Sequence, residues 1–211
     1  MRNFAVLGLL TLLAATANAD TNSRFDVDTF LALKSISSPK ISPDGEFIAY
    51  TLENRNLETD DWESAVWMQP KAGGDPIRMT GVGSSGWSPA WSPDNRFLAV
   101  LTDRADRTQV WLFDRRGGDA YQLTDIKQGV SSFMWSPDGT KMLLSIKDPS
   151  PADLDEEKRP NPRPYVIDRL QFKRDYVGYI ERRRTHIYVL DVATRSTRQV
   201  TFGDYDDYSA S

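Results

Sequence analysis

Short apolar runs separated by polar turn residues recur along the chain. Three of them directly follow a proline-containing turn, at positions 47–51, 97–101 and 142–146. A second apolar run follows in each case, at positions 65–68, 110–113 and 187–190. Runs of about four to eight residues, rich in β-branched and aromatic side chains and bounded by turn signals, are typical of strands. The pattern therefore predicts an all-β protein.

The turn before each first run has the sequence Ser-Pro-Asp-Gly or a close copy, at residues 42–45, 92–95 and 136–139. The proline presets φ for the first central position, the aspartate bonds its own backbone, and the glycine accepts the positive φ that closes a hairpin. Asparagine, which replaces glycine in the second copy, is the next most tolerant of that conformation. We therefore predict three equivalent turns with structural roles for Pro43, Asp44, Gly45, Pro93, Asp94, Asn95, Pro137, Asp138 and Gly139.

A threonine that ends a short polar–apolar segment is a second periodic marker, at Thr80, Thr124 and Thr201. The first two lie 13 residues before the proline of the next turn, and the three turn prolines are 50 and 44 residues apart. Periods of about 40–50 residues with several short strands indicate β-propeller blades of four strands. The segment that approaches each tryptophan, such as 130–134, is assigned as the fourth strand. We predict a partial β-propeller over residues 37–211 with about three to four blades, in repeats around 41–80, 91–124 and 135–201.

The same spacing places the last residue of the chain inside a repeat. Trp91 and Trp135 each follow the marker threonine by 11 residues, so the tryptophan that matches Thr201 would be residue 212, one beyond Ser211. We therefore expect the 211 residues to be the front piece of a longer protein. An incomplete ring of blades leaves sheet faces uncovered, so we also expect this piece alone to associate into oligomers.

The first 19 residues have the features of a secretory signal peptide. Residues 1–3 carry one positive charge, residues 4–15 are mainly apolar, and Ala17 and Ala19 form a small-x-small site, so cleavage is expected before Asp20. The apolar stretch is shorter than the ~20 residues of a membrane-spanning helix. We expect a periplasmic or secreted protein with no membrane attachment after the signal is removed.

Residues 20–36 are expected to be a helical lead-in to the first blade. Asp26 or Asp28 is positioned to cap a short helix whose apolar face would be Phe30, Leu31 and Leu33. An apolar face of this kind is expected to pack on the rim of the propeller.

Composition excludes several function classes. The chain has 39% hydrophobic residues, a net charge of −4 and no cysteine, which is typical of a soluble globular protein without the basic bias of a nucleic-acid binder. With no cysteine and a single histidine, it lacks the side chains of a zinc or iron site. The acids Asp204, Asp206 and Asp207 lack the glycine and distal glutamate of a calcium loop. We expect no cofactor, no metal ion and no nucleic-acid partner.

The third repeat contains an insertion. Its proline and threonine markers, Pro137 and Thr201, are 64 residues apart, against 31 in the second repeat, so about 33 extra residues lie between positions 147 and 185. Residues 148–164 are rich in proline and charge and are expected to form an exposed loop rather than helix or strand. Residues 165–172 and 176–180 are expected to be two added strands. We call residues 147–185 the arm; it is either part of the working face or a decorative or oligomer-forming hairpin.

Several of these segments together resemble a known family. Residues 28–33 leading into 41–50, the Trp-Ser-Pro-Asp repeats and residues 163–170 of the arm resemble the S9 (prolyl oligopeptidase) family of serine peptidases. With residues 186–191 and 202–207, the chain is most similar to its acylaminoacyl-peptidase-like branch. The WD40-like Trp-Ser-Pro-Asp-Gly repeat alone is shared with TolB, the periplasmic propeller protein of the Tol system.

The resemblance implies an N-terminal propeller that caps a C-terminal α/β-hydrolase domain. In the family, that second domain holds the Ser-Asp-His triad, and the propeller restricts access to short peptides. We expect the domain to be absent from residues 1–211, so no catalytic residue is transferred to this chain. The full-length parent is expected to be a serine-type oligo- or aminopeptidase, and the 211-residue piece alone is expected to be inactive.

The residues themselves offer few candidates for chemistry. No serine in residues 81–86 has glycine at both −2 and +2, as a Gly-x-Ser-x-Gly nucleophile elbow requires. His186 begins a predicted strand, where a structural role is favoured over that of a general base. Glu156 and Glu157 have the residue type of a pair that binds a substrate amine, but they lie in a proline- and charge-rich loop without the surroundings of such a site. The basic run 182–184 is more typical of a solvated loop than of a site that binds a carboxylate.

Two further hypotheses remain beside the peptidase propeller. The first is a non-enzymatic periplasmic propeller that binds other proteins, similar to that of the Tol system. The second is a propeller enzyme, such as a lactonase, with its chemistry in the central channel.

Overall fold

A computed structural model describes residues 26–154, 164, 166–168, 170–175, 178–180 and 182–207. The predicted signal peptide, including Ala17, Ala19 and Asp20, lies outside these residues, as do Glu156 and Glu157. Among the described residues, no helix has the length and apolar character needed to cross a membrane.

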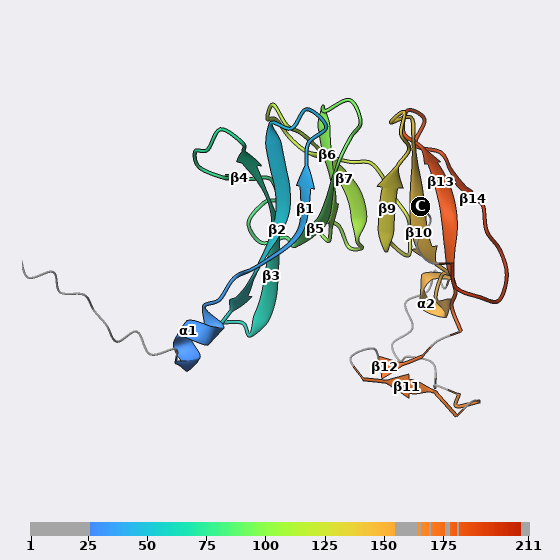
Figure 1. Ribbon diagram of the computed structural model, residues 1–211. Helices are drawn as coiled ribbons and strands as arrows, with labels where there is room; N and C mark the ends of the chain where they lie inside the picture. Colours follow the sequence, from blue (N-terminus) through green and yellow to red (C-terminus); the bar gives the residue numbers. More distant parts are fainter. Residues whose placement is uncertain are drawn as a thin grey trace, which may run out of the picture.

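Most of the described chain forms three four-stranded antiparallel sheets that follow one another along an arc (Figure 1). Blade 1 contains β1 (Ser35–Ile41), β2 (Phe47–Asn56), β3 (Asp61–Pro70) and β4 (Ile77–Arg78). Blade 2 contains β5 (Gly86–Trp91), β6 (Phe97–Thr102), β7 (Gln109–Asp114) and β8 (Tyr121–Gln122). Blade 3 contains β9 (Ser132–Trp135), β10 (Lys141–Lys147), β13 (Thr185–Asp191) and β14 (Thr197–Gln199). The predicted all-β fold with four-stranded blades is confirmed.

The strand that approaches each tryptophan belongs to the sheet that follows it. Trp91, at the end of β5, pairs with Leu98 of β6, and Trp135, at the end of β9, pairs with Met142 of β10. The reason is the turn itself, because a tight hairpin joins two neighbouring antiparallel strands. This segment is therefore the first strand of a blade, and its assignment as the fourth strand was wrong.

The three predicted turns have the same hydrogen bonds. In the first, the Ser42 hydroxyl donates to Asp44 Oδ1 across 2.6 Å and accepts from the backbone N–H of Phe47 across 3.0 Å. The corresponding pairs in the other two turns are Ser92 with Asp94 and Phe97, and Ser136 with Asp138 and Lys141. The φ angles of Gly45, Asn95 and Gly139 are +72°, +63° and +69°. The left-handed conformation expected from the sequence is thus present in each copy.

Each marker threonine continues the sheet where the short fourth strand ends. Thr124 Oγ1 accepts the backbone N–H of Val110 across 2.9 Å, and Leu123 N–H donates to the Val110 carbonyl across 2.8 Å. Thr80 receives Val66 N–H in the same way at 3.1 Å, and Thr201 receives Ile187 N–H at 2.9 Å. The hydroxyl therefore replaces one ladder hydrogen bond in each blade, which explains why threonine recurs there.

The hydrophobic core lies between the blades, and blade 2 is covered on both faces. Leu98 and Val100 of β6 pack in one cluster with Met68 of blade 1. Ala99 and Leu101, which alternate with them along β6, pack in a second cluster with Leu144 of blade 3. Successive residues of a strand point to opposite faces of the sheet, so a continuous apolar run such as β6 requires a neighbour on each side.

The lead-in contains the expected helix but not its expected packing. In α1 (Val27–Leu31), Asp26 is the N-cap and accepts the backbone N–H of Thr29 across 2.8 Å. No residue of α1 is buried, and the side chains of Phe30 and Leu33 are 59% and 55% exposed. The apolar face is therefore not packed on the rim of the described blades, and that prediction was wrong.

The arm differs in two respects from its prediction. A short helix, α2 (Pro151–Leu154), forms where only loop was expected. Its proline is at the first position, where a helix tolerates this residue. The added strands are β11 (Lys173–Arg174) and β12 (Gly178–Tyr179), shorter than expected, and they pair antiparallel. Described residues 166–168 and 170 lie outside both strands.

Candidate functional site at the base of the arm

The arm leaves and re-enters blade 3 at one end of the sheet, opposite the Ser-Pro-Asp turns (Figure 1). Lys147, the last residue of β10, pairs with Thr185, the first residue of β13, so the two ends of the arm are neighbours in the sheet. Asp148 continues this pairing, since its N–H donates to the Arg184 carbonyl across 2.7 Å and its Oδ2 accepts Arg184 N–H across 3.0 Å. Arg183 Nη1 also donates to the Asp148 carbonyl at 3.2 Å. We call these residues the arm base.

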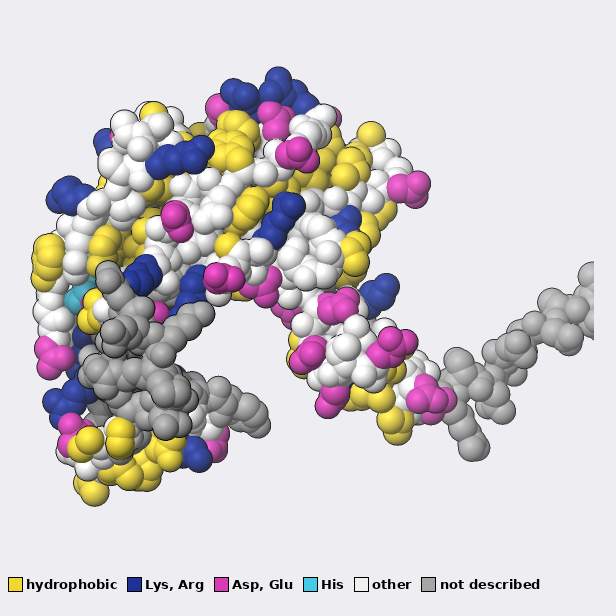
Figure 2. Space-filling model, turned by 180° about the vertical axis from the view of Figure 1, so that it is seen from behind, with side chains coloured by type: hydrophobic (Ala, Val, Ile, Leu, Met, Phe, Trp, Pro, Cys, Tyr) yellow, Lys and Arg dark blue, Asp and Glu magenta, His cyan; other side chains and the backbone are white. Residues whose placement is uncertain are grey.

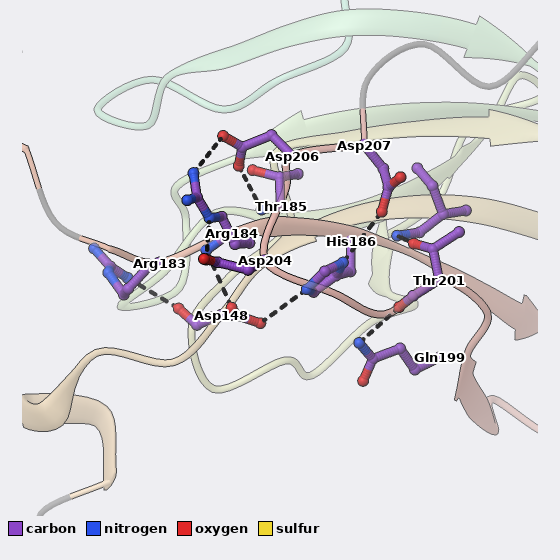
Figure 3. A network of polar contacts seen from close by, with 11 residues as sticks. Asp148, Arg183, Arg184, Thr185, His186, Gln199, Thr201, Asp204, Asp206 and Asp207 are labelled. Carbon is purple, nitrogen blue, oxygen red and sulfur yellow. Dashed lines mark hydrogen bonds and ion pairs between the residues drawn. The ribbon is translucent and has the colours of Figure 1, made fainter.

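His186 lies between two carboxylates at the arm base (Figure 3). Its side chain is buried, with Nδ1 3.1 Å from Asp207 Oδ2 and Nε2 3.7 Å from Asp148 Oδ1. Because both ring nitrogens face acids, the ring is oriented to hold these acids and not to accept a proton from a serine hydroxyl. This geometry favours the structural role over that of a general base.

The loop that follows Thr201 is attached to the arm base through its acidic residues. Arg184 Nε lies 2.9 Å from Asp204 Oδ1, and Arg184 Nη1 lies 3.6 Å from Asp206 Oδ2. Asp206 Oδ1 also accepts Thr185 N–H across 2.8 Å. We call residues 202–207 the exit loop.

Hydrogen bonds from the Thr201 hydroxyl and then from His186 hold the pKa of Asp207 below its ordinary value. All three acids of the exit loop are thus occupied by protein partners. Among the described residues, no group of three or more acidic or histidine side chains is arranged to hold a metal ion.

A buried aspartate attaches α2 to blade 2. Asp153 is 7% exposed, and its Oδ2 accepts the Ser150 hydroxyl at 2.6 Å and the Ser150 N–H at 2.7 Å. Its Oδ1 is 3.1 Å from Nη2 of Arg107, which lies between β6 and β7, and Arg183 is 3.9 Å away. The hydrogen bonds from Ser150, and then the two guanidinium groups, lower the pKa of Asp153. The sequence reasoning missed this contact, because nothing in the pattern relates residues 46 positions apart.

The remaining sequence candidates have structural partners. Gly86 packs so closely on Thr80 that a Cβ there would lie 2.4 Å from Thr80 Cγ2, so the link between blades 1 and 2 is close-packed where it enters β5. In the basic run, Arg182 pairs with Asp168 at 2.5 Å, while the other two arginines bind Asp148 and the exit loop as described above. The basic run therefore holds the arm in place. The sequence alone predicted that this run would be a solvated loop.

A shallow groove of about 390 Å³ lies between blades 2 and 3. Leu123 and Leu190 belong to the core cluster beneath it, and Arg195 lines it with its guanidinium 5.5 Å from the Tyr121 ring. Seen from behind, the three blades follow an arc around an open space (Figure 2).

Comparisons with known proteins agree with this architecture. No family model matches the chain. The uncharacterized peptidase YuxL of Bacillus subtilis strain 168 is 30% identical over 178 residues, which are 82% of this chain and 27% of YuxL. The acylaminoacyl peptidase of Pyrococcus horikoshii has 20% identity and a TM-score of 0.63, over 82% of this chain and 25% of its own. A structure assigned to TolB of Agrobacterium tumefaciens has 18% identity and a TM-score of 0.52, over 80% and 49%.

These matches define the class of the chain as a β-propeller of the kind found in peptidases and in TolB. More particularly, they confirm the resemblance to the propeller portion of S9-family, acylaminoacyl-peptidase-like proteins. The chain spans about a quarter of the length of the two peptidases it matches.

Proposed function

We propose that this chain is the N-terminal propeller of a secreted serine peptidase that hydrolyses short peptides, and that the propeller limits which substrates reach the catalytic domain. The main support is the sequence match to a peptidase over 82% of this chain but only 27% of that protein. A catalytic domain would then lie in the part of the protein that the match does not cover.

The described residues support a scaffolding role for the blades. Blade 2 is packed by buried core residues on both faces, and ionic contacts tie the inserted segment to blade 2 and to the exit loop of blade 3. Rigid elements that carry inserted loops are suited to screening substrates by size. Peptide cleavage itself would require a nucleophile, a base and an oxyanion hole supplied by the further domain.

Expression of the complete gene tests the catalytic part of the proposal. We expect a Gly-x-Ser-x-Gly segment downstream of residue 211, labelling of its serine by a fluorophosphonate, and hydrolysis of chromogenic short peptides. The 211-residue chain should show neither labelling nor hydrolysis. A complete gene without such a segment would exclude a serine peptidase of this type.

Peptides of increasing length test the restriction of access. The full-length protein should cleave short peptides with a kcat/KM that falls steeply with length, and it should leave a folded protein intact. Equal kcat/KM values for a short peptide and for a long unfolded chain that contains the same cleavage site would overturn gating while leaving peptidase activity in place.

The proposed export can be tested by cell fractionation and N-terminal sequencing. We expect the mature protein outside the cytoplasm with Asp20 as its first residue. Changing Ala19 to a bulky residue, as in Ala19→Phe, should leave an unprocessed precursor. A cytoplasmic protein that keeps Met1 would exclude export.

A non-enzymatic propeller that binds envelope proteins is the second candidate. It is supported by the match to TolB over 80% of this chain and 49% of that one. It predicts a gene that ends after the blades and a product that retains defined envelope proteins in a pull-down. These outcomes are the opposite of those expected for the peptidase.

A further inference from the structure

His186 of blade 3 corresponds in position to Gln109 of blade 2. Each residue directly precedes the residue whose N–H is bound by the marker threonine, namely Val110 and Ile187. The Gln109 side chain accepts the Thr124 hydroxyl at 2.7 Å and donates to the Ile126 carbonyl at 2.7 Å. An uncharged amide therefore fastens the loop that leaves blade 2 to its own strand.

An ionisable pair replaces that amide in blade 3. His186 Nδ1 lies 3.1 Å from Asp207 Oδ2 of the exit loop. A second carboxylate, that of Asp148, faces the other ring nitrogen from the arm at 3.7 Å. The ring therefore stands between Asp148, where the chain enters the arm, and Asp207 of the exit loop (Figure 3). The other contacts between the arm and the exit loop come from Arg184 and Thr185, where the chain leaves the arm.

A neutral imidazole has one N–H donor, whereas an imidazolium has two. In the structure, the Asp207 carboxylate is within hydrogen-bond distance of the ring, and the Asp148 carboxylate lies beyond it. We propose that His186 is a proton-operated latch: when it is protonated it binds Asp148 as well as Asp207, and so fastens the arm base to the exit loop.

The surrounding charges are compatible with a positive charge on His186. The guanidinium of Arg184 is engaged by Asp204 and Asp206. That of Arg183 contacts the Asp148 carbonyl and lies 3.9 Å from Asp153 of α2.

On β10, Ile146 is the residue opposite His186, so Lys147 projects from the other face of the sheet. Among these described neighbours, the acids thus provide a partner for each cation and one for each nitrogen of the imidazolium.

Hydrogen exchange measured by mass spectrometry on the intact gene product tests the latch. Peptides that contain the amides of Arg184 and Asp207 report on it, because these N–H groups bind Asp148 Oδ2 and the Thr185 carbonyl. After correction for intrinsic exchange, we expect protection on the order of tenfold greater at about pH 5.5 than at about pH 8. Peptides around Val110 and Ile126 provide an internal control, because Gln109 does not titrate.

His186→Gln is the matched variant, because glutamine does the corresponding work in blade 2. It should keep the arm base protected to the same extent at both pH values. Asp148→Asn is the second variant, since it retains the histidine and removes only the second carboxylate, and it too should lose most of the pH dependence. Unchanged pH dependence in either folded variant, or equal protection of the native protein at both pH values, would overturn the proposal.

Discussion

The indole nitrogen of Trp91 donates a hydrogen bond to the carbonyl oxygen of Lys40 across 3.0 Å, from the first strand of blade 2 to the first strand of blade 1. Trp135 repeats the contact one blade later, with Ala90 as the acceptor at 3.3 Å. The Trp91 ring is 8% exposed and packs in the cluster between the two blades. The repeated tryptophan therefore sets the spacing of neighbouring blades through both a hydrogen bond and buried apolar area.

Substitution of Trp91 should separate these two contributions. Trp91→Phe keeps a ring but leaves the Lys40 carbonyl without its donor, so we expect a loss of about 1 kcal/mol in the free energy of unfolding. Trp91→Ala also removes the ring from the cluster and should cost about 3–5 kcal/mol. Urea denaturation of the purified protein measures both. Trp62→Phe is the control, because the Trp62 side chain is 66% exposed and should change stability little.

The sequence was informative about local turn chemistry and about periodicity. The positive φ of Asn95 followed from its alignment with Gly45 and Gly139, because backbone conformation at a tight turn depends on the residue itself. The strand that precedes Trp91 was assigned as a fourth strand, because the spacing of a repeat does not say at which residue one blade begins. That boundary became clear only from the pairing of β5 with β6.

The candidate site was less accessible to sequence reasoning. His186 was recognised as structural, but its two acidic partners were not, since Asp148 and Asp207 come from opposite sides of its strand in the sequence. Contacts of this kind depend on where the arm and exit loop pack. No local propensity or spacing encodes that packing, and the ion pair of Arg107 with Asp153 was missed for the same reason.

Asn95 should be replaceable by glycine but not by alanine. Its φ of +63° costs an alanine roughly 1–2 kcal/mol, whereas glycine adopts it freely. Its side chain also accepts the backbone N–H of Asp44 across 3.1 Å, a contact between the turns of two blades that both variants lose. We expect Asn95→Ala to lower the urea midpoint clearly more than Asn95→Gly. Equal midpoints would show that backbone strain is not the deciding term.

Thr124→Val tests the hydroxyl that replaces a ladder hydrogen bond at the end of the fourth strand of blade 2. Valine has nearly the same shape, but it leaves the buried Val110 N–H without its acceptor and removes one of the two donors to Gln109 Oε1. We expect a loss of about 1–3 kcal/mol in unfolding free energy, the typical cost of an unsatisfied buried group. Thr197→Val, at an exposed position of β14, is the control and should be close to neutral. A neutral result for Thr124→Val would mean that the hydroxyl is not needed to end the blade.

The turn aspartates should contribute to stability in acid. The hydrogen bond from the Ser136 hydroxyl, followed by those from Thr140, lowers the pKa of Asp138 from 3.8 to about 2. A carboxyl whose pKa is depressed on folding stabilises the folded state above its unfolded pKa, and this contribution is lost as the pH falls through the folded value.

Asp138 should thus lose its contribution between about pH 4 and about pH 2. Unfolding free energies measured across this range should fall less steeply for Ser136→Ala and Asp138→Asn than for the native protein. Parallel curves for all three proteins would contradict the assignment.

The attachment of α2 to blade 2 should depend more on Asp153 than on its ionic partner. Arg107 is 58% exposed, so its ion pair is screened by water, and Arg107→Ala should cost less than about 1 kcal/mol. Asp153→Ala also removes the acceptor of two hydrogen bonds from Ser150 in a buried position, and should cost about 1–3 kcal/mol. The double variant should match Asp153→Ala alone, because the arginine has no further role once its partner is gone. Strictly additive losses in urea denaturation would show that the two side chains act independently and that the attachment lies elsewhere.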